Sequence, residues 1–199
     1  MRYGSDHKAE TRRKILDIAS RRFRKEGVEA VGVASVMADC GLTHGGFYAH
    51  FKSKEELVAA ALDHGLCEAG DRIFDYAEKT EDKIDAYIRA YLSPFHRDST
   101  EAGCAFSALA PELARLDGPV RATMAGRIEP YLDRIGRLLP QKDAATDPAS
   151  ARRQATALFS LLMGSLQLAR LTEDRTLSDS ILESGVKAAL DLVSVFEGV

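Results

Sequence analysis

The segment over residues 33–54 constrains the fold of this chain more than any other, because it predicts two short helices joined by a glycine turn. Val33, Val36 and Met37 give the first of these helices one apolar face, at positions i, i+3 and i+4. Gly41 follows where that helix must end, and glycine accepts the left-handed conformation that is common at helix C-termini. A helix-turn-helix of this size is the unit that places its second helix in the major groove of DNA.

The second helix, expected over residues 44–50, combines polar groups with two glycines. Gly45 and Gly46 lower helix propensity, which is unusual in a purely structural helix, but they let a backbone approach DNA closely. The Tyr48 hydroxyl can bind a phosphate, and Lys54 is expected to pair with a phosphate beside the next helix. Near the start of the chain, Lys8, Arg12, Arg13 and Lys14 also suit phosphates that flank the groove. The predicted DNA-contacting residues are Arg13, Thr43 (also the N-cap), His44, Gly45, Gly46, Tyr48, His50 and Lys54.

The run CGLTHGGFYAHFKSKEEL, residues 40–57, resembles the signature of the TetR/AcrR family of bacterial transcriptional regulators. It shows a glycine turn, a small hydroxyl residue, a short helix ending in tyrosine, a phenylalanine three residues later, and a Ser-Lys pair before an acidic helix start. The resemblance implies a three-helix DNA-binding domain followed by a larger helical domain that binds an effector and forms a dimer. Two positions depart from the family pattern. Gly32 stands where a threonine is frequent, which removes a phosphate-binding hydroxyl and weakens the helix cap, and Met37 replaces a frequent alanine as a packing variant.

Apolar periodicity predicts helices nearly throughout, so the expected fold class is all-α. We expect a helix-turn-helix domain over residues 1–53 and an effector-binding and dimerisation domain over residues 54–199. Gln141–Ser150 is expected to be a flexible loop, and Pro130 predicts a kink or break. The predicted helices span residues 5–26, 33–40, 44–50, 54–79, 83–95, 103–116, 119–139, 155–171 and 180–196, with Pro94 expected to stop the fifth.

Charge is distributed unevenly along the chain. Up to Val58 there are 11 Lys and Arg against 8 Asp and Glu, whereas the remainder has 16 against 22. A basic first segment on an acidic body suits a protein that presents one end to DNA, although such a bias is also typical of a solvated surface. The absence of an 18-residue apolar run, an N-terminal signal and a disulfide-type cysteine pattern predicts a cytoplasmic protein without membrane contact.

Catalytic motifs do not appear in the sequence. Neither a nucleophile–base spacing nor a phosphate loop is present, and His-Gly-Gly alone is a weak match to an oxyanion motif. The spacing of the three cysteines argues against a zinc site. We therefore expect no enzyme activity, no cofactor and no metal.

Aromatic and flexible apolar residues in the central helices predict an effector cavity. Tyr87, Tyr91 and Phe95 recur at i, i+4 and i+8, a stripe that more often belongs to an ordinary core than to a pocket. The family resemblance favours a pocket but leaves its ligand open. The predicted effector-binding residues are Tyr87, Tyr91, Phe95, Cys104, Phe106, Met124, Ile128, Tyr131, Phe159, Met163 and Gln167, with His96 and Arg170 as further polar candidates.

The last two helices are apolar around most of their circumference, so each needs packing partners on two sides. A second copy of the chain can supply one partner, and the alternative is burial of both helices within a monomer. The family resemblance also implies a dimer through these helices. The predicted dimer-interface residues are Leu161, Gly164, Leu168, Leu171, Ile181, Val186, Ala189, Leu190 and Val193.

These observations predict a homodimeric regulator, expected to be a repressor, that binds a palindromic operator in double-stranded DNA and is released by an unidentified small-molecule effector. One alternative is a thiol-based sensor. Cys104 follows Gly103 near a helix start, where the helix dipole lowers a thiol pKa, although a buried inert thiol also fits. The other alternative is a helical protein-interaction module that does not bind DNA.

Overall fold

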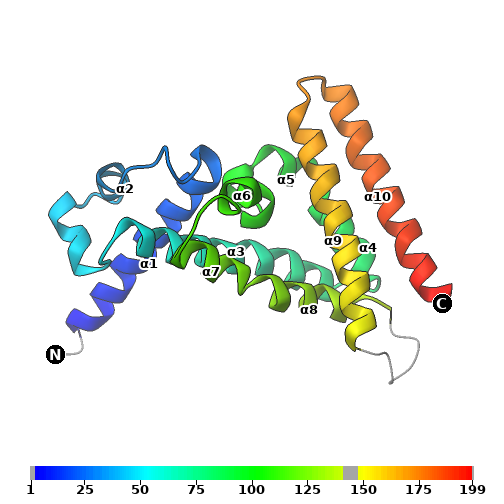
Figure 1. Ribbon diagram of the computed structural model, residues 1–199, viewed down its shortest axis with the longest axis horizontal. Coiled ribbons are helices and arrows are strands. Elements are labelled where there is room, and N and C mark those ends of the chain that lie inside the picture. The colour runs from blue at the N-terminus through cyan, green and yellow to red at the C-terminus, as the bar shows by residue number, and fades with distance from the viewer. Residues whose placement is uncertain (1–2, 141–147, 199) are drawn as a thin grey trace. The chain divides into compact units, whose positions relative to one another are not determined.

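The computed structural model describes residues 3–140 and 148–198, and every regular element in that part of the chain is a helix (Figure 1). The all-α prediction is thus confirmed. None of the helices in these two ranges has the length and apolarity to cross a membrane. The elements are α1 (Tyr3–Glu26), α2 (Val33–Asp39), the 3₁₀ helix η1 (His44–Ala49), α3 (Lys54–Glu78), α4 (Lys83–Tyr91), α5 (Pro94–Asp98), the 3₁₀ helix η2 (Thr100–Ala102), α6 (Ala105–Leu113), α7 (Pro119–Ala125), α8 (Ile128–Leu138), α9 (Pro148–Leu171) and α10 (Arg175–Gly198).

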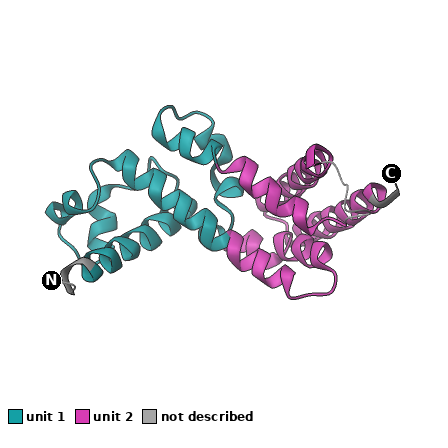
Figure 2. Cartoon of the chain, turned by 90° about the horizontal axis from the view of Figure 1, so that it is seen from below, with its two compact units in different colours: residues 1–69, 100–126 teal, residues 70–99, 127–199 magenta. Residues whose placement is uncertain are grey.

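The chain divides into two compact units, coloured separately in Figure 2. Unit 1 comprises Met1–Ala69 and Thr100–Gly126, and unit 2 comprises Gly70–Ser99 and Arg127–Val199. The long helix α3 therefore begins in one unit and ends in the other. The functional division predicted at residue 53 stays a prediction, since it concerns roles and not compactness.

Unit 1 is built around the close approach of α1 and α3. A Cβ placed at Gly65 would overlap Ser20 Oγ, so only glycine lets the two helices come this near. Arg24 is 2% exposed and donates hydrogen bonds to the carbonyls of Gly65, at 3.1 Å, and Gly103, at 2.7 Å. In addition, the Glu112 carboxylate accepts a hydrogen bond of 2.8 Å from the Val28 N–H. Buried polar groups therefore tie α1 to α3 and to the segment around α6.

Unit 2 has an aromatic core. The rings of Tyr87 and Tyr91 on α4 are fully buried, and Tyr87 stacks on Phe74 of α3 with centroids 5.1 Å apart. Tyr131 of α8 and Phe159 of α9 complete the cluster, with ring centroids 5.0 Å from each other. Aromatic contacts at these separations contribute beyond the apolar area they bury. The core thus joins four helices that are distant in sequence.

The last two helices pack closely along their length. A Cβ at Gly185 would lie 2.7 Å from Ser165 Cβ and 2.9 Å from Leu92 Cδ1, so this glycine allows α10 to approach both α9 and the end of α4. By contrast, a Cβ at Gly164 would meet no atom within 4 Å. The close approach of α9 and α10 is therefore made at Ser165 and Gly185.

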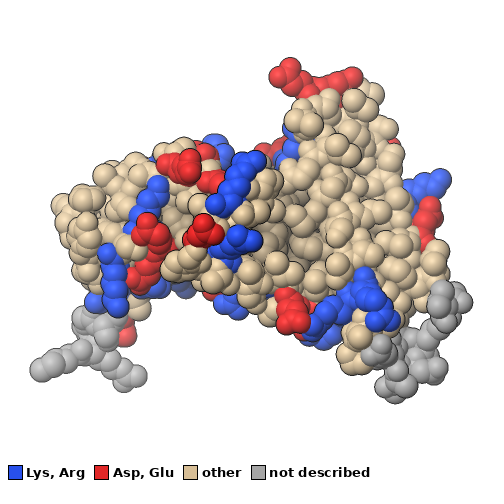
Figure 3. Space-filling view, in the orientation of Figure 1, with Lys and Arg blue, Asp and Glu red and all other residues tan. Residues whose placement is uncertain are grey.

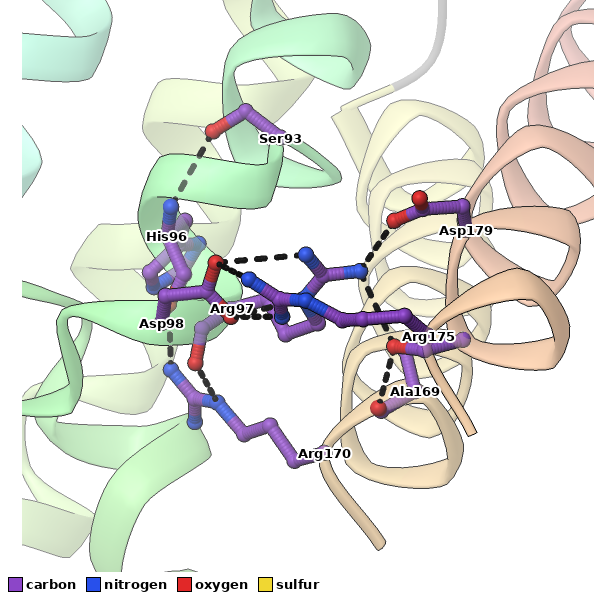
Figure 4. A network of polar contacts seen from close by, with 9 residues as sticks. Ser93, His96, Arg97, Asp98, Ala169, Arg170, Arg175 and Asp179 are labelled. Atoms are coloured by element: carbon purple, nitrogen blue, oxygen red, sulfur yellow. Dashed lines mark hydrogen bonds and ion pairs between the residues drawn. The ribbon is translucent and has the colours of Figure 1, made fainter. Parts of the chain in front are cut away.

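A buried arginine links α5 to the α9–α10 pair (Figure 4). Arg97 is 5% exposed, and its guanidinium donates to Ser178 Oγ at 2.9 Å and to Asp179 Oδ1 at 2.5 Å. It also pairs with Asp98, which accepts two hydrogen bonds of 2.7 Å from Arg175. These arginines hold the pKa of Asp98 well below its usual range, with the Arg175 hydrogen bond as the largest cause and the Arg97 hydrogen bond next.

Two helix boundaries correct the sequence prediction. Pro94 does not stop the helix over 83–95, because α4 has already ended at Tyr91 and Pro94 opens α5 in its first turn, with Ser93 as the N-cap. The helix predicted over 119–139 does break, but at Gly126 and Arg127, a few residues before Pro130. The loop expected over 141–150 lies outside the described residues up to 147, and α9 starts at Pro148.

Candidate DNA-binding site

The glycine turn between α2 and η1 forms as the sequence predicts. Gly41 has a φ of +71°, the left-handed region that glycine adopts without strain. Its N–H donates to the Ala38 carbonyl at 2.8 Å, and the Leu42 N–H donates to the Met37 carbonyl at 2.9 Å. These two bonds satisfy carbonyls that the end of α2 would otherwise leave without a partner.

The helix after the turn, η1, separates buried from exposed aromatic rings. Phe47 and Phe51 are 2% and 1% exposed and stack with centroids 5.7 Å apart. Tyr48 is 67% exposed, and its ring lies edge-to-face with the exposed His44 ring, with centroids 6.2 Å apart. The phenylalanines therefore fix the helix on unit 1 and leave His44 and Tyr48 at the surface, and contact of these two side chains with DNA stays a prediction.

The start of η1 corrects one detail of the prediction. Thr43 occupies the N-cap position, but its side chain makes no capping hydrogen bond, so its exposed hydroxyl is free for another partner. Gly45 and Gly46 differ in surroundings. A Cβ at Gly45 would meet no atom within 4 Å, whereas one at Gly46 would contact Thr43 Oγ1 at 3.7 Å and Met37 Cε at 3.8 Å. Among residues 3–140 and 148–198, nothing therefore requires glycine at position 45.

The cationic residues of α1 have unequal roles. The Arg12 guanidinium lies over the Phe51 ring, 4.7 Å from its centroid, and Lys14 Nζ donates to the Cys40 carbonyl at 2.9 Å. Both residues thus brace the helix-turn-helix, a role that the sequence did not indicate because the partners are at least 26 residues away. Arg13 is exposed and stays the candidate for phosphate contact.

A reciprocal cap fixes the start of α3 beside η1. The Glu56 N–H donates to Ser53 Oγ at 3.2 Å, and the Lys52 N–H donates to Glu56 Oε2 at 2.8 Å. Ser53 therefore caps the start of α3. Lys54, the first residue of α3, is half-buried.

His50 closes η1 as its C-cap. Its N–H donates to the Phe47 carbonyl at 2.9 Å. Burial is the main cause that lowers the pKa of His50, and the nearby charges of Lys8 and Arg12 lower it further. Its surroundings therefore favour the neutral imidazole. At the start of α2, Gly32 is an N-cap without a side-chain bond, as its identity predicts.

The surface charge is mixed. On the face drawn in Figure 3, Lys and Arg side chains alternate with Asp and Glu and do not form one continuous basic patch. The uneven charge distribution along the sequence thus gives no single-sign surface in this view.

Comparison with known proteins identifies the family. A model of the bacterial regulatory proteins of the tetR family matches residues 15–61, which include α2 and η1. A second model, described as the tetracyclin repressor-like C-terminal domain, matches residues 80–184, more than half of the chain. This chain belongs to the TetR family. It is a DNA-binding transcriptional regulator, as the resemblance in residues 40–57 predicted.

Individual TetR-family relatives match this chain along most of their length. The chain is 25% identical over 173 residues to the HTH-type transcriptional regulator YxaF of Bacillus subtilis, covering 85% of this chain and 90% of YxaF. The crystal structure of reduced NemR, an Escherichia coli transcriptional repressor, has a TM-score of 0.70 at 23% identity and covers 90% of this chain and 95% of NemR. A structure of AibR in complex with isovaleryl coenzyme A and operator DNA has a TM-score of 0.58 at 21% identity, and the match covers 88% of this chain and 96% of the AibR chain. These two structures show that the fold is shared.

The predicted effector residues of this TetR-family chain lie in both units. Tyr87, Tyr91, Tyr131 and Phe159 form the aromatic core of unit 2, and their role in effector binding stays a prediction. The i, i+8 stripe does not continue to Phe95, which is 66% exposed because the chain leaves α4 at Leu92. The remaining members are buried in unit 1 (Cys104, Phe106, Met124), or half-buried or exposed in unit 2 (Met163, Ile128, Gln167).

The polar groups expected around the effector bind the backbone instead. His96 is 3% exposed, with Nδ1 2.7 Å from the Tyr91 carbonyl oxygen. Arg170 donates to the carbonyls of His96, at 2.6 Å, and Arg97, at 3.2 Å. Cys104 is the N-cap of α6, as predicted, but it is only 1% exposed.

The predicted dimer residues divide into two sets. Ala189 and Val193 are 0% and 5% exposed within the single chain and cannot present a surface, which corrects their assignment. Leu168 and Leu171 of α9 are 58% and 82% exposed. Gly164 is also exposed, and Leu161, Ile181, Val186 and Leu190 are half-buried. The sequence set missed two further exposed apolar residues on α10, Leu177 and Val195.

Proposed function

We propose that this TetR-family protein is a homodimeric repressor that holds a palindromic operator through its two η1 helices and releases it when a small molecule binds to its C-terminal helical part. The observation that carries the proposal is the pair of exposed rings, His44 and Tyr48, on a helix anchored by the buried Phe47 and Phe51. Such a helix can present polar groups to a groove without losing its own position. We expect His44 and Tyr48 to contact bases or phosphates.

The exposed apolar side chains on α9 and α10 support dimer formation. Leu168, Leu171, Leu177 and Val195 are all more than half exposed. Large apolar side chains exposed on two neighbouring helices are candidates for a protein interface, which larger exposed apolar patches mark. A single six-residue η1 also buries too little area for useful specificity, whereas two copies about 34–36 Å apart match one turn of DNA.

Release by an effector follows from population shift. Operator DNA selects one separation of the two η1 helices, and an effector that binds better to another separation moves the equilibrium away from DNA. The helix α3 connects the part that carries η1 to unit 2, so it is the element through which this change would pass. The relatives support a repressor that binds a small molecule, since NemR is named a repressor and the AibR structure holds isovaleryl coenzyme A together with operator DNA.

A reporter assay tests the repressor role. An operator sequence, first selected by the purified protein from random duplex DNA, is placed between a promoter and a reporter gene in a bacterial host. Expression is measured with and without the protein. We expect the protein to lower expression, and the Tyr48→Phe variant to repress less because it loses the phosphate-binding hydroxyl. Higher expression in the presence of the protein would make it an activator and would refute the repressor proposal.

A further inference from the structure

Three side chains with metal-binding groups meet between α1 and α3 in unit 1. Asp17 comes from α1, and His64 and Glu68 come from α3, where their i, i+4 spacing places them on one helix face. One ligand atom from each residue lies within 4.8 Å of the other two, and His64 Nε2 is 2.5 Å from Asp17 Oδ1. None of the three belongs to the DNA-contacting set. This cluster therefore has no role in the function proposed above.

The helix packing fixes the positions of these groups in advance. The backbone of Gly65 packs against the Ser20 side chain and so sets the separation of α1 and α3. This contact lies within one helical turn of all three metal-binding side chains. Arg24 adds a buried hydrogen bond to the Gly65 carbonyl. The ligands therefore come from two helices that cannot move apart without breaking buried contacts. A metal site needs this kind of rigid support.

The chemistry of the cluster fits a zinc-type cation. One imidazole nitrogen and two carboxylate oxygens form a three-ligand set that Zn²⁺ completes with a water molecule, and the two carboxylates balance the charge of the ion. Metal–ligand bonds of about 2.0–2.2 Å require ligand atoms roughly 3.3 Å apart in tetrahedral geometry. The His64–Asp17 pair, now at 2.5 Å, would have to open by about 0.8 Å, within reach of a side-chain rotation. The side chains of His64, Asp17 and Glu68 are 27%, 41% and 32% exposed, so solvent can supply the ion.

We propose that Asp17, His64 and Glu68 form a binding site for a divalent transition-metal ion, of which Zn²⁺ is the best match, and that the ion clamps α1 to α3. Arg21 is the existing rival cation, with Nη2 3.7 Å from Glu68 Oε1. At that distance it forms an ion pair without a hydrogen bond, and its side chain is 53% exposed, so it can withdraw into solvent. Sequence patterns gave no sign of the site, because Asp17 and His64 are 47 residues apart and the spacing of the cysteines argues against zinc.

Titration of the metal-free protein with Zn²⁺ by calorimetry tests the proposal. We expect one ion per chain, and a thermal unfolding midpoint raised by roughly 5–10 °C at a free Zn²⁺ concentration about 100 times the Kd. Co²⁺ bound at the same site should show the intense visible absorption of tetrahedral coordination. In His64→Gln the amide can still donate to Asp17, but we expect Zn²⁺ affinity at least tenfold weaker. Glu68→Gln should weaken binding similarly, and the metal-free unfolding midpoints of both variants check that they fold.

Two control variants separate this site from adventitious binding. His7 is an exposed histidine outside the cluster, and Cys67 is an exposed thiol next to Glu68 on α3. We expect His7→Asn and Cys67→Ser to bind Zn²⁺ as tightly as the wild type. The proposal is overturned if the wild type binds no Zn²⁺ below millimolar concentration, if folded His64→Gln and Glu68→Gln retain full affinity, or if either control variant loses it.

Discussion

Gly45→Ala tests whether the backbone of η1 approaches DNA closely. The added Cβ would meet no protein atom within 4 Å, and Gly45 is not among the three glycines with positive φ. Inside the protein the change should therefore only restrict the unfolded chain, which stabilises by about 0.4–1 kcal/mol. For a chain of this length that corresponds to roughly 1–4 °C in the unfolding midpoint. At an η1–DNA contact the same methyl group would collide with the duplex, and overpacking costs about 1–3 kcal/mol.

Fluorescence anisotropy with a labelled operator duplex measures the consequence. We expect Gly45→Ala to bind about 5- to 150-fold more weakly, because 1.4 kcal/mol corresponds to about a factor of ten in Kd. Gly136→Ala on α8 is the control, because its Cβ would make only an ordinary contact of 3.7 Å with Ala151 and Gly136 lies outside the predicted DNA-contacting set. It should bind within about threefold of the wild type. Equal operator affinity of folded Gly45→Ala and wild-type protein would refute the close approach.

Four further predictions follow from the other contacts. Lys54→Ala should weaken binding to all DNA sequences alike and reduce the salt dependence by about one phosphate contact per subunit, and a sequence-selective loss in a duplex panel would exclude that role. Cys104→Ser should leave operator binding and its response to a thiol-reactive agent unchanged, because Cys104 is 1% exposed; loss of release in the variant would make Cys104 the sensor. Arg97→Met should lower the free energy of unfolding in urea by about 2–3 kcal/mol, since it leaves carboxylates without their buried partner. Because the pKa of Asp98 is lowered in the folded protein, the stabilisation from this carboxylate should be complete above about pH 4 and be lost as the pH falls below it. A wild-type free energy of unfolding that stays flat from pH 5 to 2 would contradict this. Leu171→Glu should convert the dimer to monomer in light scattering, because this side chain is 82% exposed on α9, and an intact dimer would place the interface elsewhere.

The DNA-binding segment could be predicted because its determinants are local. The Gly41 turn, the Ser53 cap and the burial of Phe47 and Phe51 all follow from residues within a few positions of one another. The 3₁₀ form of η1 was not evident, since propensity separates helix from coil better than it separates one kind of helix from another.

Contacts between distant segments could not be predicted. Arg97 is buried against residues 81 and 82 positions later, and nothing near Arg97 in the sequence marks it as different from a surface arginine. Apolar pattern alone also failed to separate the inner face of α10, with Ala189 and Val193, from its outer face, because small and β-branched residues occur on both. Likewise, the stripe through Tyr87 and Tyr91 assumed that α4 continues to Phe95.

Selection of binding sites from random duplex DNA tests the central claim most directly. The purified protein is incubated with the pool, bound DNA is sequenced, and the best site is measured at two salt concentrations. The account predicts a palindrome whose half-sites are about one helical turn apart, with affinity that falls steeply as salt rises. A single non-palindromic half-site, or an affinity that does not change with salt, would contradict a dimer that holds DNA through two η1 helices.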